Sequence, residues 1–299
     1  MKIVVSDKLA LEGVEIMEKA GHDVVRAWDE PKENLPSIVG DCDALVIRSA
    51  TKARKELIDA APNLKVIGRA GIGLDNVDLE HAKAKGITVV NTPTATTISV
   101  AELTFTLMLA SYREVVRGTV TTKNGEWAKK QLKGKELYGK TLGVVGIGRI
   151  GQAVAERAIA FGMKVVAYDP YAKPEQYENV GLDDLIARSD FITLHLPLTP
   201  ETKHMISTDQ FAAMKDGVVI LNVARGGTID EEALYNAMTS GKVKMAALDV
   251  FEVEPPVDNK LLTLDNLICT PHIGAQTEEG QTRAGIMVAE KVLEELAKL

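Results

Sequence analysis

The stretch that decides the fold reads Leu142-Gly143-Val144-Val145-Gly146-Ile147-Gly148-Arg149-Ile150-Gly151. It places a GxGxxG pattern at the end of an apolar, strand-like run and at the start of a helix-like segment that continues to Phe161. In such a unit, Gly146 permits the tight turn, Gly148 lets the backbone approach a pyrophosphate, and Gly151 lets helix and strand pack closely. The helix N-terminus adds free N–H groups and a partial positive charge. The stretch therefore predicts a dinucleotide site.

The residue that closes the next strand indicates which dinucleotide binds. Lys164 to Tyr168 reads as a strand, and Asp169 follows it, 18 positions after Gly151 (169 − 151). A carboxylate there can accept hydrogen bonds from the adenosine ribose hydroxyls, and it would repel a 2′-phosphate. The spacing therefore favours NAD over NADP. The alternative is an ordinary tight turn in which Asp169 only caps a strand end.

Short runs rich in Val and Ile alternate with helix-like segments along the whole chain, which is typical of βαβ units and a parallel sheet. We expect five strands in the first half, over residues 2–6, 23–27, 44–48, 65–69 and 87–90. We expect six in the second half, over residues 141–146, 164–168, 191–194, 218–222, 245–249 and 267–270. Six is the number that a full dinucleotide-binding sheet has.

The length of 299 residues fits two domains of ordinary size. A long helix is expected over about 97–117, and a last helix over about 276–298 would return to the first domain. The predicted fold class is α/β with two doubly wound parallel-sheet domains. The substrate domain would be flavodoxin-like and would comprise residues 1–95 and 276–299, and the NAD-binding Rossmann domain would span residues 96–275.

Composition and charge exclude several classes of function. The net charge of −7 and the pI near 5.4 disfavour a broad attraction to nucleic acid or anionic membranes, so a small molecule is the expected partner. Cys42 and Cys269 lie in apolar stretches without CxxC spacing, which argues against a disulfide framework and a metal site. The chain starts without a signal-peptide pattern and lacks a long apolar run, so we expect a cytoplasmic protein.

Three polar residues follow predicted strands of the second half, where ligands of doubly wound sheets bind: Arg225, Glu254 and His272. Oxidation of a 2-hydroxy acid needs a base for the hydroxyl proton, a hydride acceptor and a cation that holds the carboxylate. A His, NAD and an Arg supply these three functions, and a Glu beside the His would raise its pKa. Taken singly, a His is more often structural, and an Arg or Glu near a turn is usually solvated.

Together with the glycine-rich loop, five further segments resemble the D-2-hydroxyacid dehydrogenases. They are residues 195–202 (HLPLTPET), 222–227 (NVARGG), 247–251 (ALDVF), 254–255 (EP) and 271–274 (PHIG). The resemblance implies that Arg225 binds the substrate carboxylate, that His272 is the acid/base with Glu254 as its partner, and that Asp249 holds the nicotinamide carboxamide. It also implies a homodimer paired through the NAD-binding domain, and a cleft that closes between the domains. The implied NAD contacts are Ile72, Thr96, Gly146, Gly148, Arg149, Ile150, Gly151, Asp169, Leu196, Pro197, Val223, Ala224, Arg225, Asp249, His272, Gly274 and Ala275.

Within that family, residues 46–51 (VIRSAT) and 67–78 (IGRAGIGLDNVD) look like the phosphoglycerate dehydrogenase subgroup. Arg48 and Arg69 close neighbouring strands and could neutralise a phosphate. The expected substrate contacts are Arg48, Ser49, Arg69, Gly71, Arg225 and His272. The loop at residues 94–97 reads TATT where many relatives have a Gly-Asn pair, so the sequence departs from the family pattern there.

This resemblance implies NAD-dependent oxidation of 3-phospho-D-glycerate to 3-phosphohydroxypyruvate, which feeds serine synthesis. Because the sequence stops at Leu299, we expect no serine-sensing regulatory domain of the kind that long relatives carry. A glyoxylate or hydroxypyruvate reductase is the alternative enzyme, since it would keep Arg225, Glu254 and His272. An NAD-sensing binding protein like the corepressors of the family is the alternative from another class.

Overall fold

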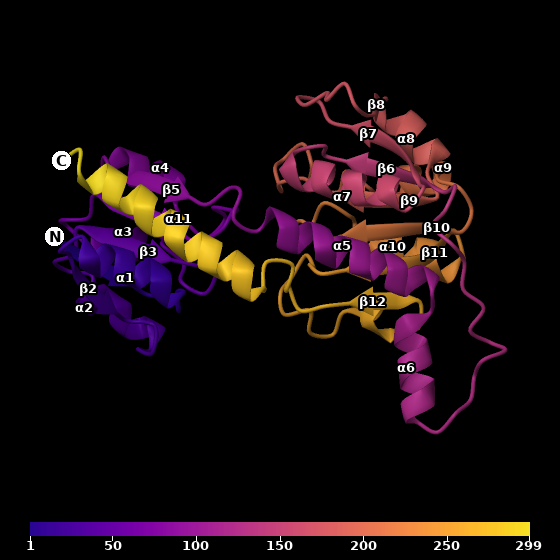
Figure 1. The fold of residues 1–299 in the computed structure, drawn as a ribbon, viewed down its shortest axis with the longest axis horizontal. Helices are drawn as coiled ribbons and strands as arrows, with labels where there is room; N and C mark the ends of the chain where they lie inside the picture. Colours follow the sequence, from indigo (N-terminus) through magenta and orange to yellow (C-terminus); the bar gives the residue numbers. More distant parts are fainter. The chain divides into compact units, whose positions relative to one another are not determined.

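The computed structural model describes residues 1–299, which divide into two compact units (Figure 1). Unit 1 comprises Met1–Thr97 and Ala275–Leu299, and unit 2 comprises Ile98–Gly274. Each unit is built on one parallel sheet with helices on both faces, which confirms the predicted α/β fold class. None of the helices is both long and apolar enough to cross a lipid bilayer.

The sheet of unit 1 has the strand order β2-β1-β3-β4-β5, the flavodoxin-like order. Its strands are β1 (Lys2–Val5), β2 (Asp23–Arg26), β3 (Ala44–Ile47), β4 (Val66–Arg69) and β5 (Thr88–Asn91). β1 pairs with both β2 and β3, so the strand order reverses there. In open parallel sheets, ligands bind at the carboxyl edge beside such a switch point.

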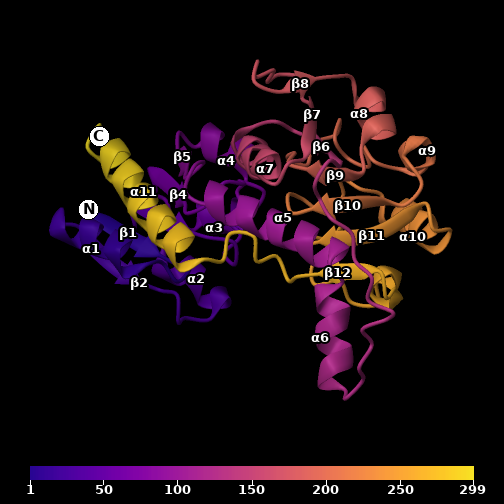
Figure 2. The same ribbon diagram turned by 45° about the vertical axis from the view of Figure 1, so that its right-hand side comes forward.

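Two helices cover one face of this sheet and three cover the other. α1 (Leu11–Lys19) and α11 (Glu278–Leu296) lie side by side in Figures 1 and 2, and a side chain at Gly13 would overlap the Gly285 carbonyl. The opposite face is covered by α2 (Leu35–Ile38), α3 (Lys55–Asp59) and α4 (Leu79–Ala84), with a short 3₁₀ helix, η1 (Lys32–Asn34), before α2. The apolar side chains that these helices bury form two core clusters.

The sheet of unit 2 has seven strands rather than the six that we predicted, in the order β12-β11-β10-β9-β6-β7-β8. The strands are β6 (Thr141–Val145), β7 (Lys164–Tyr168), β8 (Glu178–Asn179), β9 (Phe191–Leu194), β10 (Val218–Asn222), β11 (Val243–Leu248) and β12 (Leu267–Cys269). β8 completes the Rossmann order, and β12 is the additional strand. β8 escaped prediction because two exposed polar residues carry no apolar pattern.

The prediction of one continuous helix over residues 97–117 is wrong. The structure has two helices, α5 (Thr97–Tyr112) and α6 (Val115–Lys123), separated at Glu114, whose φ is +53°. The Tyr112 carbonyl accepts the backbone N–H of Lys135 at 2.9 Å instead of continuing the helix ladder. This contact comes from a distant segment, so the local sequence could not reveal the break.

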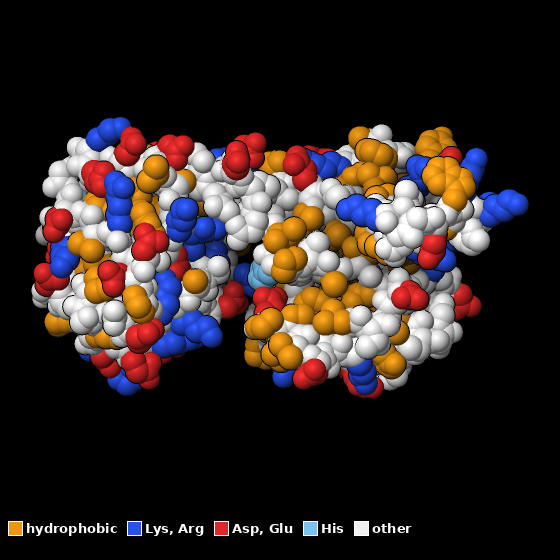
Figure 3. Space-filling view, turned by 90° about the horizontal axis from the view of Figure 1, so that it is seen from below, with side chains coloured by type: hydrophobic (Ala, Val, Ile, Leu, Met, Phe, Trp, Pro, Cys, Tyr) orange, Lys and Arg blue, Asp and Glu red, His pale blue; other side chains and the backbone are white.

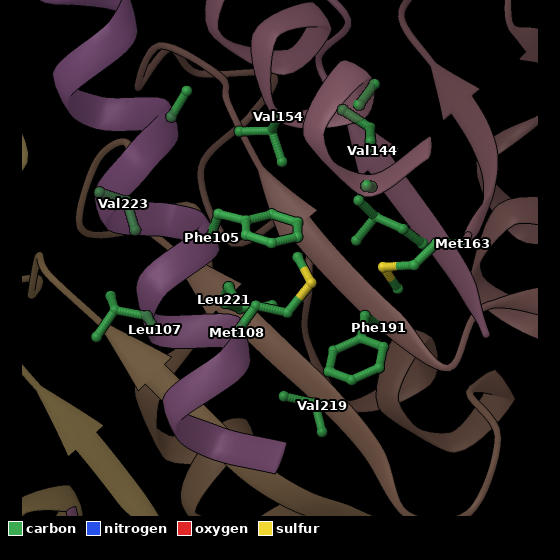
Figure 4. Packing of buried hydrophobic residues seen from close by; sticks show 14 of the residues in the cluster. Phe105, Leu107, Met108, Val144, Val154, Met163, Phe191, Val219, Leu221 and Val223 are labelled. Atoms are coloured by element: carbon green, nitrogen blue, oxygen red, sulfur yellow. The ribbon is translucent and has the colours of Figure 1, made fainter. Parts of the chain in front are cut away.

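The other helices of unit 2 follow the strands of its sheet. They are α7 (Arg149–Ala160), α8 (Leu182–Arg188), α9 (Thr208–Ala213), α10 (Glu231–Thr239) and the 3₁₀ helix η2 (Lys260–Thr263). α5 and α7 cover one face, where Phe105 and Met108 of α5 pack toward Phe191 of the sheet (Figure 4). The Phe191 and Tyr112 rings lie 4.4 Å apart in an edge-to-face contact, which fixes α5 on the sheet.

α6 is exposed along its length, and none of its residues is buried. It extends away from the sheet of unit 2 in both ribbon views (Figures 1 and 2). Val115, Val116 and Val120 are each about half exposed, at 52%, 45% and 51%. On the face shown in Figure 3, the surface of unit 2 displays several groups of hydrophobic side chains, whereas that of unit 1 mixes basic and acidic ones.

Candidate active site

A histidine and a glutamate form a hydrogen-bonded pair beyond the carboxyl ends of β11 and β12. His272 Nδ1 lies 2.8 Å from Glu254 Oε2, and Glu254 Oε1 accepts the backbone N–H of Phe251 at 3.2 Å. The hydrogen bond with Glu254 raises the pKa of His272 above its ordinary value, although burial opposes the shift. Since a carboxylate only accepts, Nδ1 is the protonated nitrogen and Nε2 is left to give or take a proton.

Burial alone would raise the pKa of Glu254. The hydrogen bond and charge of His272, the Phe251 N–H and the charge of Arg225 outweigh burial, so its pKa lies below the ordinary value. Arg225 also acts on His272 through its charge, and this effect lowers the pKa of the imidazole. The structure therefore brings the three residues predicted from sequence, Arg225, Glu254 and His272, into electrostatic contact.

Arg225 lies on the turn that follows β10, and Asn222 organises this turn. The buried Asn222 side chain donates to the Arg225 carbonyl at 2.9 Å and accepts the Ala224 N–H at 3.0 Å. The Thr228 hydroxyl donates to the same carbonyl at 2.9 Å. Asn222 was not predicted as a site residue, although a buried amide at the end of an apolar strand is a signal for such a role.

Asp249 holds the turn that carries His272. It is 1% exposed, and its carboxylate accepts the Thr270 hydroxyl at 2.5 Å and the N–H groups of Ile273 and Gly274 at 2.8 and 2.7 Å. His272 itself has a φ of +53°, a left-handed conformation that a non-glycine residue adopts only when its surroundings impose it. Three hydrogen bonds to one buried carboxylate supply that constraint.

The glycine-rich loop has the shape that a dinucleotide requires. Gly146 has a φ of +93°, and a side chain on it would meet the His195 carbonyl at 2.6 Å. A side chain on Gly151 would meet the Gly146 carbonyl at 2.2 Å, so strand and helix can approach only without it. By contrast, nothing lies within 4 Å of a side chain built on Gly148, where α7 begins without a side-chain cap. This open helix N-terminus fits a pyrophosphate.

Asp169 lies beside this loop. Its carboxylate accepts the Ile147 N–H at 3.1 Å and the N–H groups of Tyr171 and Ala172 at 2.8 and 2.9 Å. It thereby fixes the glycine-rich loop and still has lone pairs for an adenosine ribose. His195 follows β9 and bonds Thr193 at 3.1 Å, and burial lowers its pKa to about 3, so its ring is neutral.

The remaining predicted NAD contacts divide between the units. Leu196, Pro197, Val223, Ala224 and Gly274 follow strands of unit 2 at the same sheet edge as the glycine-rich loop. Ile72, Thr96 and Ala275 belong to unit 1. The structure contains no group of three or more His, Cys, Asp or Glu side chains that is suited to a metal ion.

The predicted substrate residues of unit 1 lie at the carboxyl edge of its sheet. Ile47 pairs with Arg69, so Arg48 and Arg69 stand at the ends of adjacent strands. The Arg69 guanidinium occupies the space that a side chain at Gly71 would take, and Gly71 has a φ of +150°. Ser49 follows Arg48 on the same turn.

Asp7 was not predicted, and it holds this turn from the end of β1. It is 5% exposed and accepts the N–H groups of Arg48 and Thr51 at 2.7 and 3.0 Å, the Thr51 hydroxyl at 2.7 Å and the Lys32 ammonium at 2.8 Å. Burial would raise the pKa of Asp7, but these donors hold it below the ordinary value. The sequence could have indicated this role of Asp7, because its carboxylate directly follows the predicted strand 2–6, which lies at the switch point of the sheet.

Comparisons with known proteins agree with this geometry. The family model for the NAD-binding domain of D-isomer specific 2-hydroxyacid dehydrogenases matches residues 105–274. The chain is 55% identical to a hydroxypyruvate reductase of Thermotoga maritima, over 99% of this chain and 98% of that protein. It is 54% identical to a D-3-phosphoglycerate dehydrogenase of Methanocaldococcus jannaschii, over 98% of this chain but 57% of that longer protein. A D-lactate dehydrogenase from Aquifex aeolicus, solved with NAD and lactic acid, superposes with a TM-score of 0.85 at 32% identity, over 100% of this chain and 96% of that one.

Proposed function

Because the chain belongs to the D-isomer specific 2-hydroxyacid dehydrogenase family and its cofactor is NAD, we propose that it oxidises 3-phospho-D-glycerate to 3-phosphohydroxypyruvate. This reaction would serve as the first step of serine synthesis. The choice of substrate is supported by Arg48 and Arg69, which stand at the ends of adjacent strands of unit 1. From there their two guanidinium groups would bind one phosphate.

In the proposed reaction, His272 Nε2 takes the proton of the substrate hydroxyl, while Nδ1 stays bonded to Glu254. The Glu254 carboxylate stabilises the imidazolium that forms. Arg225 binds the substrate carboxylate and fixes its orientation. Bound NAD would supply the acceptor for the hydride that leaves the carbon carrying the hydroxyl. In the reverse direction, protonated His272 gives its proton to the keto oxygen.

Gly148, Arg149, Ile150 and Gly151 at the N-terminus of α7 would hold the pyrophosphate of NAD, and Asp169 would hold the adenosine ribose. Asp249 would receive the carboxamide of the nicotinamide in addition to holding the His272 turn. We also propose that the chain is a homodimer joined through unit 2, because α6 is a nine-residue helix with exposed valines and no buried residue. Such a short helix is marginal in water without a partner surface.

A hydroxypyruvate reductase is the second candidate, favoured by the relative from Thermotoga maritima, which matches along nearly its whole length. The two candidates share Arg225, Glu254 and His272 and differ in the demand for a phosphate contact. The arginines of unit 1 therefore provide the discriminating experiment.

We expect Arg48→Ala and Arg69→Ala to lower kcat/KM for phosphohydroxypyruvate by roughly 10- to 100-fold, the worth of a charge-assisted hydrogen bond. Their kcat/KM for hydroxypyruvate should fall far less, because that acid has no phosphate. Arg54→Ala is the matched control, since Arg54 is an exposed arginine of unit 1 that bonds the Asp75 carbonyl. Equal losses for both acids in the Arg48 and Arg69 variants would contradict the proposed phosphate contact.

A further inference from the structure

The segment that carries Glu254 is fastened to α10 by two other glutamates. The Glu231 N–H donates to Glu252 Oε1 at 3.1 Å, and the Glu252 N–H donates to Glu231 Oε1 at 2.6 Å. Each carboxylate thus accepts the backbone N–H of the other residue. The two segments, 21 residues apart in sequence, are joined by a closed ring of two charge-assisted hydrogen bonds.

The position of Glu231 at the first residue of α10 explains why a carboxylate suits this ring. The first-turn N–H groups of a helix have no partner within the helix, and its N-terminus favours negative charge. The Asp230 side chain caps the Ala233 N–H, and Glu252 takes the Glu231 N–H. His204 Nε2 lies 3.0 Å from Glu252 Oε1, and the Asn259 amide donates to Glu231 Oε2 at 2.6 Å. The hydrogen bond from Asn259 offsets part of the repulsion between the carboxylates.

A second contact fixes the beginning of the same segment. The Phe251 carbonyl lies so close to Gly226 that a side chain built on Gly226 would be 1.8 Å from its oxygen. Phe251 is therefore held against the turn of Arg225, and Glu252 is held against α10. Val253 is 71% exposed, so packing contributes little to this turn. Within the segment, Glu254 Oε1 accepts the Phe251 N–H at 3.2 Å, and the Glu231–Glu252 ring is the polar anchor nearest to Glu254 that ties the segment to another element.

Resting on the proposed function, we infer that Glu231 and Glu252 are positioning residues: their reciprocal hydrogen bonds hold Glu254 at the distance and angle from which it bonds His272. Neither residue touches His272. The largest charge effects on the imidazole come from Glu254, Asp249 and Arg225. We therefore expect Glu252 to act on His272 through the position of Glu254.

The test is a titration of His272 by NMR in the full chain, which has only five histidines to resolve. The variants are Glu252→Ala and Glu231→Ala, each of which opens one side of the ring, and Glu252→Gln, which keeps an acceptor oxygen for the Glu231 N–H. Glu232→Ala is the matched control, because Glu232 is the next residue of α10 and pairs with Lys260 rather than with the segment of Glu254. Glu254→Ala is the reference, and thermal unfolding shows whether each variant is folded.

We expect Glu254→Ala to lower the pKa of His272 by about 1 unit, the usual effect of removing an adjacent carboxylate. Glu252→Ala and Glu231→Ala should lower it by roughly half as much and should reduce kcat for phosphohydroxypyruvate or hydroxypyruvate about fivefold, since the acid/base pair is loosened rather than removed. Glu252→Gln and Glu232→Ala should keep the wild-type pKa. In a Glu254→Ala background, Glu252→Ala should cause no further shift.

These measurements distinguish a failure of the positioning role of Glu231 and Glu252 from a failure of the proposed pairing of His272 with Glu254. A wild-type pKa and kcat in both Glu252→Ala and Glu231→Ala, together with a lowered pKa in Glu254→Ala, would overturn the positioning role alone. A wild-type pKa in Glu254→Ala would overturn the proposed acid/base pairing itself. A further shift from Glu252→Ala in the Glu254→Ala background would show a direct charge effect and would also overturn the inference.

Discussion

His272 owes its proposed reactivity to two carboxylates with separate tasks. Glu254 sets its protonation, through a 2.8 Å hydrogen bond to Nδ1, and Asp249 sets its backbone, through three hydrogen bonds to the surrounding turn. A histidine at a strand end becomes an acid/base only when its tautomer and its orientation are both fixed. The two carboxylates of unit 2 meet these two requirements.

Replacing Glu254 should move the pH dependence of the reaction. Because Glu254 raises the pKa of His272, Glu254→Gln should lower it. Reduction of the keto acid needs protonated His272, so its rate falls as pH rises through this pKa. The descending limb should therefore move to lower pH by about 1 unit. Oxidation needs the neutral imidazole, so its ascending limb should move in the same direction.

Steady-state rates across pH in both directions measure these limbs, and the KM for NADH should stay near the wild-type value. Glu232→Gln on α10 is a suitable control, because the Glu232 carboxylate pairs with Lys260 and not with His272. Limbs that coincide with those of the wild type would show that Glu254 does not tune His272.

The sequence predicted the residues that would face a ligand but not those that support them. Arg225, Glu254 and His272 each follow a strand, so their common location could be inferred from the sheet edge. Asp7 was missed because its hydrogen bonds join the end of β1 to segments that are distant in sequence and come close only through the strand order. Asn222 bonds groups of its own turn, so its role depends on the local geometry that this turn adopts after β10. Glu231 and Glu252 meet only after α10 and β11 pack together.

Among the elements, the turn from β6 to α7 is where substitutions can test the proposed dinucleotide site. Gly151 is needed for the approach of strand and helix, whereas Gly148 has open space and an ordinary backbone conformation, with φ −69°. Replacing glycine by alanine should therefore affect stability at position 151 and NAD binding at position 148.

Gly151→Ala should destabilise the protein by about 1–3 kcal/mol, the usual cost of overpacking. Gly148→Ala should leave the thermal midpoint unchanged but raise the KM for NAD on the order of tenfold, because its methyl group points to where the pyrophosphate would lie. Calorimetry and NAD titration measure the two effects. Unaltered NAD affinity in Gly148→Ala would contradict this placement of the pyrophosphate.

Elements with a strong apolar pattern were predicted well, and elements defined by distant contacts were not. The strands of unit 1 and most of those of unit 2 were found because each contains a short apolar run, in most of them buried and rich in Val and Ile. The two-residue strand β8 has no such run, and the separation of α5 from α6 depends on the contact between Tyr112 and Lys135. Tertiary contacts override local periodicity in both cases.

For the whole molecule, we propose that α6 determines the oligomeric state. Val116 and Val120 lie one turn apart and line a groove with Ala110, Leu267 and Ile268. If α6 pairs with a second chain, the mass in solution should be about twice 32.3 kDa. Val116→Asp combined with Val120→Asp should yield monomers, whereas Thr122→Asp on the same helix should not. Light scattering after size-exclusion chromatography measures the mass, and a monomeric wild type would contradict the proposal.

We propose that the chain, in the reverse direction, reduces a phosphorylated 2-keto acid with NADH. The most direct measurement is kcat/KM of the wild-type protein for phosphohydroxypyruvate, hydroxypyruvate, glyoxylate and pyruvate, followed by the absorbance of NADH. We predict the highest value for phosphohydroxypyruvate. A higher value for an unphosphorylated acid would contradict the proposed substrate, and NADH binding without turnover of any of these acids would contradict the proposed activity.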